Sequence, residues 1–279
     1  MAIQLATKYT GAVDEIFATE SRKDLVSNED FSWDGAKSVV VHSVHSVDMQ
    51  DYARVGGPAS GNWSLYGRVD DLSTSIQTMT LRKDRSFTFR VDTLDANETV
   101  GALQAASALA RQLREKVIPE VDTYTFAQMV AEAGQKPAAL ALTDANIYTA
   151  IVDASEALDN AEVPEEGRVL VVPPETFRLM KTSPDIIMET DIAQDMRLRG
   201  VIATIDGAAV VRVPANRLPA GFGFMLCHPV ACVAPTKLAD YVIHDRPPGI
   251  NGALVEGRIC YDAFVLSNKA DAILYQATT

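Results

Sequence analysis

The sequence predicts an α+β protein, in which one compact α/β lobe is embedded in an elongated set of ribbons and one long helix. Three observations support this fold class. Residues 37–92 have the pattern of a long β-hairpin without a core of its own, and residues 97–134 have that of a helix longer than a compact domain needs. After Thr143 the pattern changes to alternating helices and strands. The hairpin in particular points to assembly rather than to chemistry.

The composition is that of a globular chain and opposes several functional classes. Its formal net charge of −12 opposes general adhesion to nucleic acid. No apolar run approaches the ~20 residues that cross a bilayer, and the N-terminus lacks the basic and apolar blocks of a signal peptide. Cys227, Cys232 and Cys260 form no Cys-x-x-Cys pair, so we expect buried thiols in a reducing compartment and a protein that stays in the cytosol.

The first 35 residues are mixed and polar, and we expect them to form an extended N-terminal arm. The two-limbed hairpin follows over residues 36–92. Its first limb, Lys37–Val47, is dense in β-branched residues, and its second, Thr74–Val91, alternates apolar and polar side chains as a half-buried strand does. Because a two-stranded ribbon is marginal in water, we expect this one to find its partner on another subunit.

Residues 93–137 predict the long helix, which we call the spine. Asp95–Asn97 offers an N-cap, and Pro119 is expected to kink or restart a helix that continues to Gly134. The whole run would measure roughly 55 Å at ~1.5 Å per residue. Its apolar stripe, at steps of three and four, consists of Val100, Leu103, Ala106, Ala110, Leu113 and Val117.

Residues 138–236 predict the α/β lobe. Thr143 is expected to cap a helix, and Arg168–Val172 is apolar enough to be a strand buried on both faces. Asp206-Gly207 predicts a tight turn between two strands. The other expected elements are an inward helix face of Ile147, Ile151, Ala154 and Leu158, and core strands at Gly223–Cys227 and Val230–Val233.

Residues 237–279 predict a second long hairpin and a closing strand. The limbs lie at 238–244 and 253–266, and a turn through Asn251 joins them. We expect residues 271–275 to form the C-terminal strand.

The four histidines form no convincing metal site. His42 and His45 are three residues apart on a strand and therefore face opposite ways. Neither Cys227-His228 nor His244-Asp245 is a ready chelate, because immediate neighbours on a strand also diverge. We expect no metal.

No motif predicts catalysis or a cofactor. Gly56–Gly61 lacks the Lys-Ser/Thr of a phosphate-binding loop, and the chain has no Gly-x-Ser-x-Gly nucleophile elbow. The carboxylates between Asp153 and Glu166 are expected to form a solvated face. A soluble enzyme that uses this acidic face of the lobe is the least favoured alternative.

The order of these parts resembles that of the tailed-bacteriophage major capsid proteins with the Hong Kong 97-type coat fold. The resemblance covers nearly the whole chain and depends on the shared order of weak motifs. The stretches that carry it are Leu5–Tyr9, Val13–Phe17, Phe31–Val39, Asp51–Arg54, Phe87–Asp92, Val117–Tyr124, Gly200–Gly207, Gly257–Val265 and Lys269–Ile273.

The resemblance implies a shell subunit that is not an enzyme. Residues 36–92 would be the extended loop over a neighbouring subunit, 93–137 and 237–279 the peripheral domain, and 138–236 the axial domain. Copies would assemble as hexamers and pentamers into an icosahedral virion shell in the host bacterial cytoplasm. The shell would enclose double-stranded DNA without sequence-specific contact and without a membrane.

Further partners follow from the resemblance. The N-terminal arm is short, so a separate scaffolding protein is expected, together with a portal and decoration or head-completion proteins. Some relatives form Lys–Asn cross-links, for which Lys83 and Asn251 are the candidates here. The alternative on the same fold is an encapsulin-like cellular nanocompartment shell. The candidate inter-subunit contact residues are Arg54, Trp63, Tyr66, Arg82, Lys83, Arg85 and Asn251.

Overall fold

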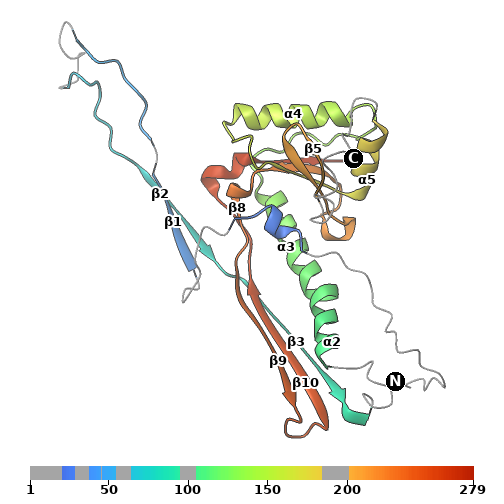
Figure 1. Ribbon diagram of the computed structural model, residues 1–279. Helices are drawn as coiled ribbons and strands as arrows, with labels where there is room; N and C mark the ends of the chain where they lie inside the picture. Colours follow the sequence, from blue (N-terminus) through green and yellow to red (C-terminus); the bar gives the residue numbers. More distant parts are fainter. Residues whose placement is uncertain (1–20, 29–37, 45, 55–63, 95–104, 184–200) are drawn as a thin grey trace. The chain divides into compact units, whose positions relative to one another are not determined.

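The computed structural model describes residues 21–28, 38–44, 46–54, 64–94, 105–183 and 201–279. The chain separates into two compact units. One is Ala36–Thr80, which we call the loop unit, and the other comprises Met1–Gly35 and Leu81–Thr279. Figure 1 shows the elements of both units.

The loop unit contains a two-stranded ribbon. Strand β1 (Ser38–Val44) pairs antiparallel with β2 (Thr74–Thr80), and Val41 lies opposite Gln77. The predicted pairing of the two limbs is confirmed over these strands.

The second limb is shorter than the sequence predicts. Instead of one strand from Thr74 to Val91, the chain leaves strand conformation at Leu81–Arg82. Strand β3 (Lys83–Asp92) then pairs with β10 (Gly252–Tyr261) rather than with β1. The alternation of apolar residues continues across the break, because Met79, Leu81 and Val91 are all buried. A period of two therefore gave no sign that the strand changes its partner.

A three-stranded antiparallel sheet follows, in the order β3-β10-β9. Strand β9 (Thr236–Asp245) and β10 form the predicted terminal hairpin. The return limb is divided, however, because β10 ends at Tyr261 and β11 (Phe264–Val265) pairs with β8 (Cys232–Val233). The expectation of one continuous limb to residue 266 is therefore wrong.

The spine helix runs through its proline without a break. It consists of α2 (Ala105–Gln112), the π-helical segment η2 (Leu113–Val117) and α3 (Ile118–Glu132). Pro119 has no N–H and its ring would collide with the carbonyl four residues earlier in an α-helix. The wider π turn, in which the Ile118 N–H bonds to the Leu113 carbonyl, accommodates it.

The spine is buried mainly in its second half. Residues Ala106 and Ala110 of the predicted stripe are exposed, so this part of the prediction is wrong, while Leu113 and Val117 are half-buried. The expected cap at 95–97, Val100 and Leu103 lie outside the described residues. The buried residues of α3 are Val121, Asp122, Thr125, Phe126 and Met129.

The lobe is built on a five-stranded mixed sheet in the order β12-β7-β4-β6-β5. Its only parallel pair, within the described part of the chain, is β4 with β6. The strands are β4 (Val169–Val172), β5 (Val201–Ile205), β6 (Ala208–Arg212), β7 (Phe222–Cys227) and β12 (Ile273–Ala277).

The central strand β4 is buried on both faces, as the sequence predicts. Val169 and Val171 belong to one core cluster with Phe126 of α3, whereas Leu170 and Val172 belong to a second cluster. Helices α4 (Ile147–Asn160) and α5 (Pro174–Thr182) cover the second face (Figure 1). Alternation along one strand therefore supplies two cores. The predicted inward face of α4, Ile147, Ile151, Ala154 and Leu158, is confirmed.

Three local predictions in the lobe have different outcomes. The tight turn is confirmed, since Asp206 and Gly207 both have positive φ, at 49° and 75°, between β5 and β6. The helix cap is wrong, because α4 begins after Asn146, whose side chain accepts the Thr143 N–H at 2.8 Å. The strand predicted at Val230–Val233 is confirmed only at Cys232–Val233 (β8), because Val230 and Ala231 belong to the 3₁₀ turn η4 (Pro229–Ala231).

Two chain ends contribute to the lobe in ways that the sequence did not indicate. Strand β12 pairs with β7 and so belongs to the lobe sheet, not to the ribbon with which it was grouped. In the N-terminal segment 21–28, Val26 is fully buried in the core with Phe126, and the Asn28 N–H donates to the Cys232 carbonyl at 2.8 Å. The remaining 3₁₀ turns are η1 (Lys23–Leu25), η3 (Ala215–Arg217) and η5 (Ser267–Ala272).

Candidate interaction surfaces

The described residues offer little for catalysis. No group of three or more His, Cys, Asp or Glu side chains among them is placed to hold a metal ion. Burial raises the pKa of the Cys232 thiol to about 12 and raises that of Cys227 as well, so neither thiol is an available nucleophile. The His228 ring is engaged by backbone groups, with Nε2 3.0 Å from the Glu166 carbonyl and Nδ1 accepting the Val230 N–H. Within the described ranges, no helix is long and apolar enough to span a bilayer.

The most exposed apolar surface lies on the loop unit. Of the fifteen large hydrophobic side chains that are exposed in the described part of the chain, nine belong to this unit. A concentration of exposed large hydrophobic side chains on one segment is typical of an interaction surface. The nine residues are Val40, Val47, Met49, Tyr52, Leu65, Tyr66, Val69, Leu72 and Ile76.

In the distal segment of the loop unit (residues 46–54 and 64–72), side chains connect the outgoing and the returning stretch of chain. The Gln50 side chain donates to the Arg68 carbonyl at 3.1 Å and accepts the Arg68 N–H. The rings of Tyr52 and Tyr66 meet edge to face with centroids 4.9 Å apart. Tyr66 is nevertheless 78% exposed. The segment therefore presents a prearranged aromatic pair to solvent.

Gly67 is required where the distal segment closes. Its φ is +90°, and a Cβ at this position would overlap the Gln50 side chain that bonds to Arg68. Only glycine combines this backbone conformation with so close an approach.

The predicted contact residues fall into two groups. Arg54 and Tyr66 are exposed in the distal segment, and Trp63 lies outside the described residues. Arg82, Lys83 and Arg85 lie together around the start of β3. Arg85 is paired with Glu120 at 2.7 Å, and the Lys83 ammonium lies 4.8 Å from the ring centroid of Tyr124.

Asn251 lies at the far end of the three-stranded sheet from Lys83. The register places Tyr261 opposite Lys83 and Gly252 opposite Asp92, so almost the whole length of β3 separates the two residues. At ~3.3 Å per residue that length is roughly 30 Å. A covalent bond between Lys83 and Asn251 would therefore have to join two subunits.

The three-stranded sheet has one packed and one charged face. Ile259 and Tyr261 of β10 pack against Val121 of the spine. Glu256 and Arg258 occupy alternate positions of the same strand, so they point to the opposite face, and both are exposed.

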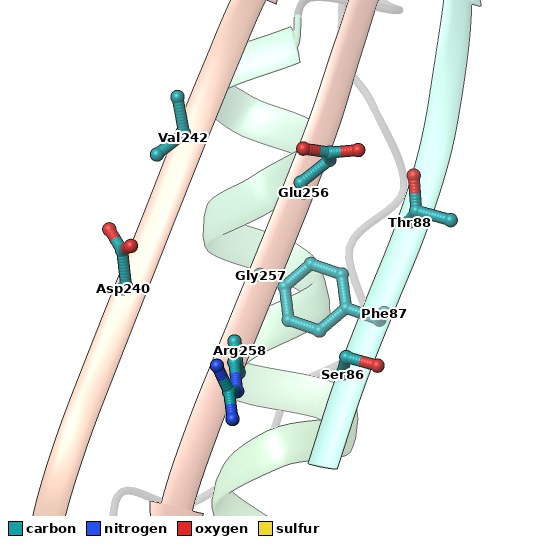
Figure 2. Close-up of a pocket in the computed structure, with 8 residues that line it drawn as sticks. All are labelled: Ser86, Phe87, Thr88, Asp240, Val242, Glu256, Gly257 and Arg258. Atoms are coloured by element: carbon teal, nitrogen blue, oxygen red, sulfur yellow. The ribbon is translucent and has the colours of Figure 1, made fainter.

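Figure 2 shows the pocket of about 430 Å³ around these charges, with Asp240 and Val242 of β9 on one side and Ser86 and Thr88 of β3 on the other. Arg258 pairs with Asp84 through two short hydrogen bonds of 2.6 and 2.9 Å. This pairing lowers the pKa of the Asp84 carboxyl and raises that of Arg258.

Two buried carboxylates, Asp122 and Asp262, were not predicted from the sequence. Asp122 in α3 accepts hydrogen bonds from the Ser21 hydroxyl (2.6 Å) and the Arg22 N–H (3.2 Å), and it pairs with Arg217 at 2.8 Å. Asp262, between β10 and β11, accepts from the Arg82 N–H, the Tyr124 hydroxyl and the Ala263 N–H. Burial and then the bond to Asp262 raise the pKa of Tyr124.

A signal for both carboxylates exists in the sequence. Asp262 is the sole charged residue of the run Ile259–Leu266, and Asp122 lies on the helix face that carries Thr125 and Phe126. A charged residue within an apolar run is buried at a cost unless it is paired.

Comparison with known proteins identifies the family of this chain. A family model described as phage capsid protein matches residues 73–274. The search of curated proteins gave no match.

Solved structures resemble the whole chain. The structure from Mycobacterium phage Che8 has a TM-score of 0.70 at 20% identity, covering 97% of this chain and 96% of that one. The mature capsid of bacteriophage PhiM1 has a TM-score of 0.70 at 15% identity, covering 99% and 92%. A virus-like particle from Pyrococcus furiosus is less similar, with a TM-score of 0.52 at 11% identity and 86% of each chain covered. At identities of 20% or less, these similarities show that the fold is shared.

Proposed function

We infer that this chain, which belongs to the phage capsid protein family, is the major capsid protein of a tailed bacteriophage. Its fold is the Hong Kong 97-type coat fold that the order of its parts predicts. It is a structural protein of the virion capsid, and copies of it assemble into the shell. The observation that carries this conclusion is the family match over residues 73–274, which spans the spine, the lobe and the ribbon. The nanocompartment alternative is not favoured.

Within the shell, residues 36–92 would act as the extended loop that lies over a neighbouring subunit. The exposed apolar residues of the loop unit support this role, because a ribbon with so little burial gains stability from a partner. The spine (93–137) and the ribbon of 237–279 would form the peripheral domain, and 138–236 the axial domain around the five- and six-fold centres. Because strand β12 pairs with β7 in the five-stranded sheet, residues 273–277 would join the axial domain rather than the ribbon.

Contacts between subunits would form at the two groups of predicted residues. The Tyr52–Tyr66 pair supplies the aromatic anchor, with Trp63 and Arg54 beside it in the sequence. Arg82, Lys83, Arg85 and Asn251 lie at the two ends of the three-stranded sheet, where they would meet neighbours.

The further partners follow from the shell itself. We expect hexamers and pentamers assembled in the host cytoplasm with a separate scaffolding protein, a portal, and decoration or head-completion proteins. Packaged double-stranded DNA would touch the wall without sequence readout, which agrees with the net charge of −12. Neither catalysis nor a cofactor is part of this role.

The test is assembly of the purified protein, with scaffolding protein supplied if required. We expect capsomers or shells in sedimentation and electron microscopy. The Tyr52→Ser, Tyr66→Ser double variant should lose most of its particles, although the unfolding free energy of the unassembled subunit should fall by no more than about 1.5 kcal/mol, because both rings are at least half exposed and mainly their contact with each other is lost. A protein that stays monomeric at high concentration under every condition would contradict the proposal, and normal particles from the double variant would remove the aromatic pair from it.

A further inference from the structure

Asp262 is a buried carboxylate that binds the backbone two residues after the last residue of the loop unit. The side chain is 2% exposed. Oδ2 accepts the backbone N–H of Arg82 at 2.8 Å, and Oδ1 accepts the Tyr124 hydroxyl at 2.7 Å and the Ala263 N–H at 2.9 Å. Burial of a carboxylate is costly, and three hydrogen bonds from fixed donors offset that cost.

The three donors come from three different parts of the fold. Arg82 is the second residue after Thr80, the last residue of the loop unit. Tyr124 belongs to the spine helix α3, where its ring meets Tyr261 edge to face with centroids 5.8 Å apart. Ala263 follows the end of β10. The carboxylate therefore joins the root of the loop to the spine and to the end of the ribbon.

The bond to Arg82 also explains where the strand is interrupted. Leu81 and Arg82 separate β2 from β3. The N–H of Arg82 is directed at Asp262, and pairing with β10 starts at the next residue, Lys83. Between the two strand ladders the backbone N–H of Arg82 is held by a side chain, and one substitution removes that bond.

We propose that Asp262 is a positioning residue for shell assembly, which rests on the proposed function. It holds the backbone at Arg82 in one conformation, so that the chain between β3 and the loop unit starts from a fixed geometry. The lever is long, because the chain from Tyr66 to Thr80 spans up to roughly 45 Å at ~3.3 Å per residue. A rotation of ~10° at the root would then move Tyr66 by roughly 8 Å, more than enough to lose a packed contact.

The test compares Asp262→Asn and Tyr124→Phe with Asp153→Asn, which makes the same chemical change at an exposed position of α4. Hydrogen exchange of the unassembled subunit is followed in peptides that cover residues 74–92, with peptides of β4 and β7 as an internal reference. Particle yield and diameter are measured by electron microscopy. Arg82→Ala serves as a second control for exchange, because it keeps the backbone N–H that Asp262 binds.

We expect Asp262→Asn to speed exchange at the Arg82 amide by roughly ten- to a hundred-fold, with the lobe strands unchanged. Tyr124→Phe keeps the ring and should give a smaller change in the same direction. Both variants should lower particle yield or broaden the distribution of diameters, and Asp153→Asn should do neither. If Asp262→Asn does not fold, the milder Tyr124→Phe decides.

Two results would overturn the proposal. One is unchanged exchange at Arg82 in the variants, and the other is faster exchange together with particles of wild-type yield and diameter. Failure of the proposed function looks different, since the wild-type protein itself would then give no particles while the exchange comparison would still report whether Asp262 holds the root.

Discussion

Replacement of Asp122 by alanine tests the buried ion pair that joins the spine helix to the lobe. The substitution removes the carboxylate oxygen 2.8 Å from Nη1 of Arg217 and leaves a guanidinium that is only 3% exposed. It also removes the acceptor of two hydrogen bonds from Ser21–Arg22. Because removal of one partner leaves the other charge buried, we expect the free energy of unfolding to fall by about 3–5 kcal/mol.

That loss is large beside the roughly 5–15 kcal/mol that stabilises a typical domain. Each kcal/mol lowers Tm by about 2–4 °C for a unit of this size, so Asp122→Ala should lower the Tm of the unassembled subunit by roughly 6–20 °C. Circular dichroism melting and urea titration measure it. The matched control is Asp84→Ala, which breaks the pair with Arg258 on the open face of the ribbon. Solvent screens that pair, so its loss should change Tm little.

A double variant distinguishes the attraction between Asp122 and Arg217 from the cost of burying their two charges. Asp122→Leu with Arg217→Met removes both charges and keeps apolar volume, so it should recover much of the stability that Asp122→Ala loses. The N-terminal segment should also exchange faster in Asp122→Ala, because Ser21 and Arg22 lose their acceptor. If Asp122→Ala and Asp84→Ala melt together, the reasoning from burial is refuted.

Two further predictions concern the ribbon. Gly252→Ala should destabilise the three-stranded sheet by about 1–3 kcal/mol more than Gly249→Ala, because a Cβ at Gly252 would overlap the carbonyl oxygen of Val91. Gly249 also has a positive φ, of +86°, but a Cβ there meets no atom within 4 Å, so it controls for backbone strain; equal melting curves for the two variants would contradict the steric argument. Burial, and then the charge of Glu120, raises the pKa of Tyr261 to about 12. An unfolded tyrosine ionises near pH ~10, so the contribution of Tyr261 to stability is complete below pH ~10 and is lost as the pH rises from ~10 towards ~12. Unfolding free energies combined with phenolate absorbance would show this decline, and a flat profile over that window would count against it.

The elements that the sequence predicts well are those whose pattern has one local cause. The run Val169–Val172 is apolar at every position, and the prolines directly after it favour a short strand buried on both faces over a helix. Asp206-Gly207 predicts its turn because both residues tolerate positive φ. The kink expected at Pro119 corresponds to a π segment just before it, since the proline must displace one helical bond.

The choice of strand partners could not be predicted in the same way. Strands β2 and β3 share one period of two, yet they pair with β1 and β10, which lie far apart in the sequence. Strand β12 likewise joins β7 of the lobe instead of the adjacent ribbon. Periodicity defines which face of a strand is buried but carries no information about the neighbour beside it, so these pairings depend on contacts that no local pattern records.

Two backbone positions, one at Arg22 and one at Arg82, are held near helix α3 by buried carboxylates. Asp122, within α3, takes hydrogen bonds from Ser21–Arg22, and Asp262 takes one from Arg82 and one from Tyr124 of α3. An extended segment buries too little apolar area to fix its own direction, whereas charge-assisted hydrogen bonds are short and directional and need few atoms. Removal of either carboxylate should therefore free one segment and leave the two-faced core of the lobe intact. Attachment and folding are thus separable in this subunit, and a shell built from many copies depends on both.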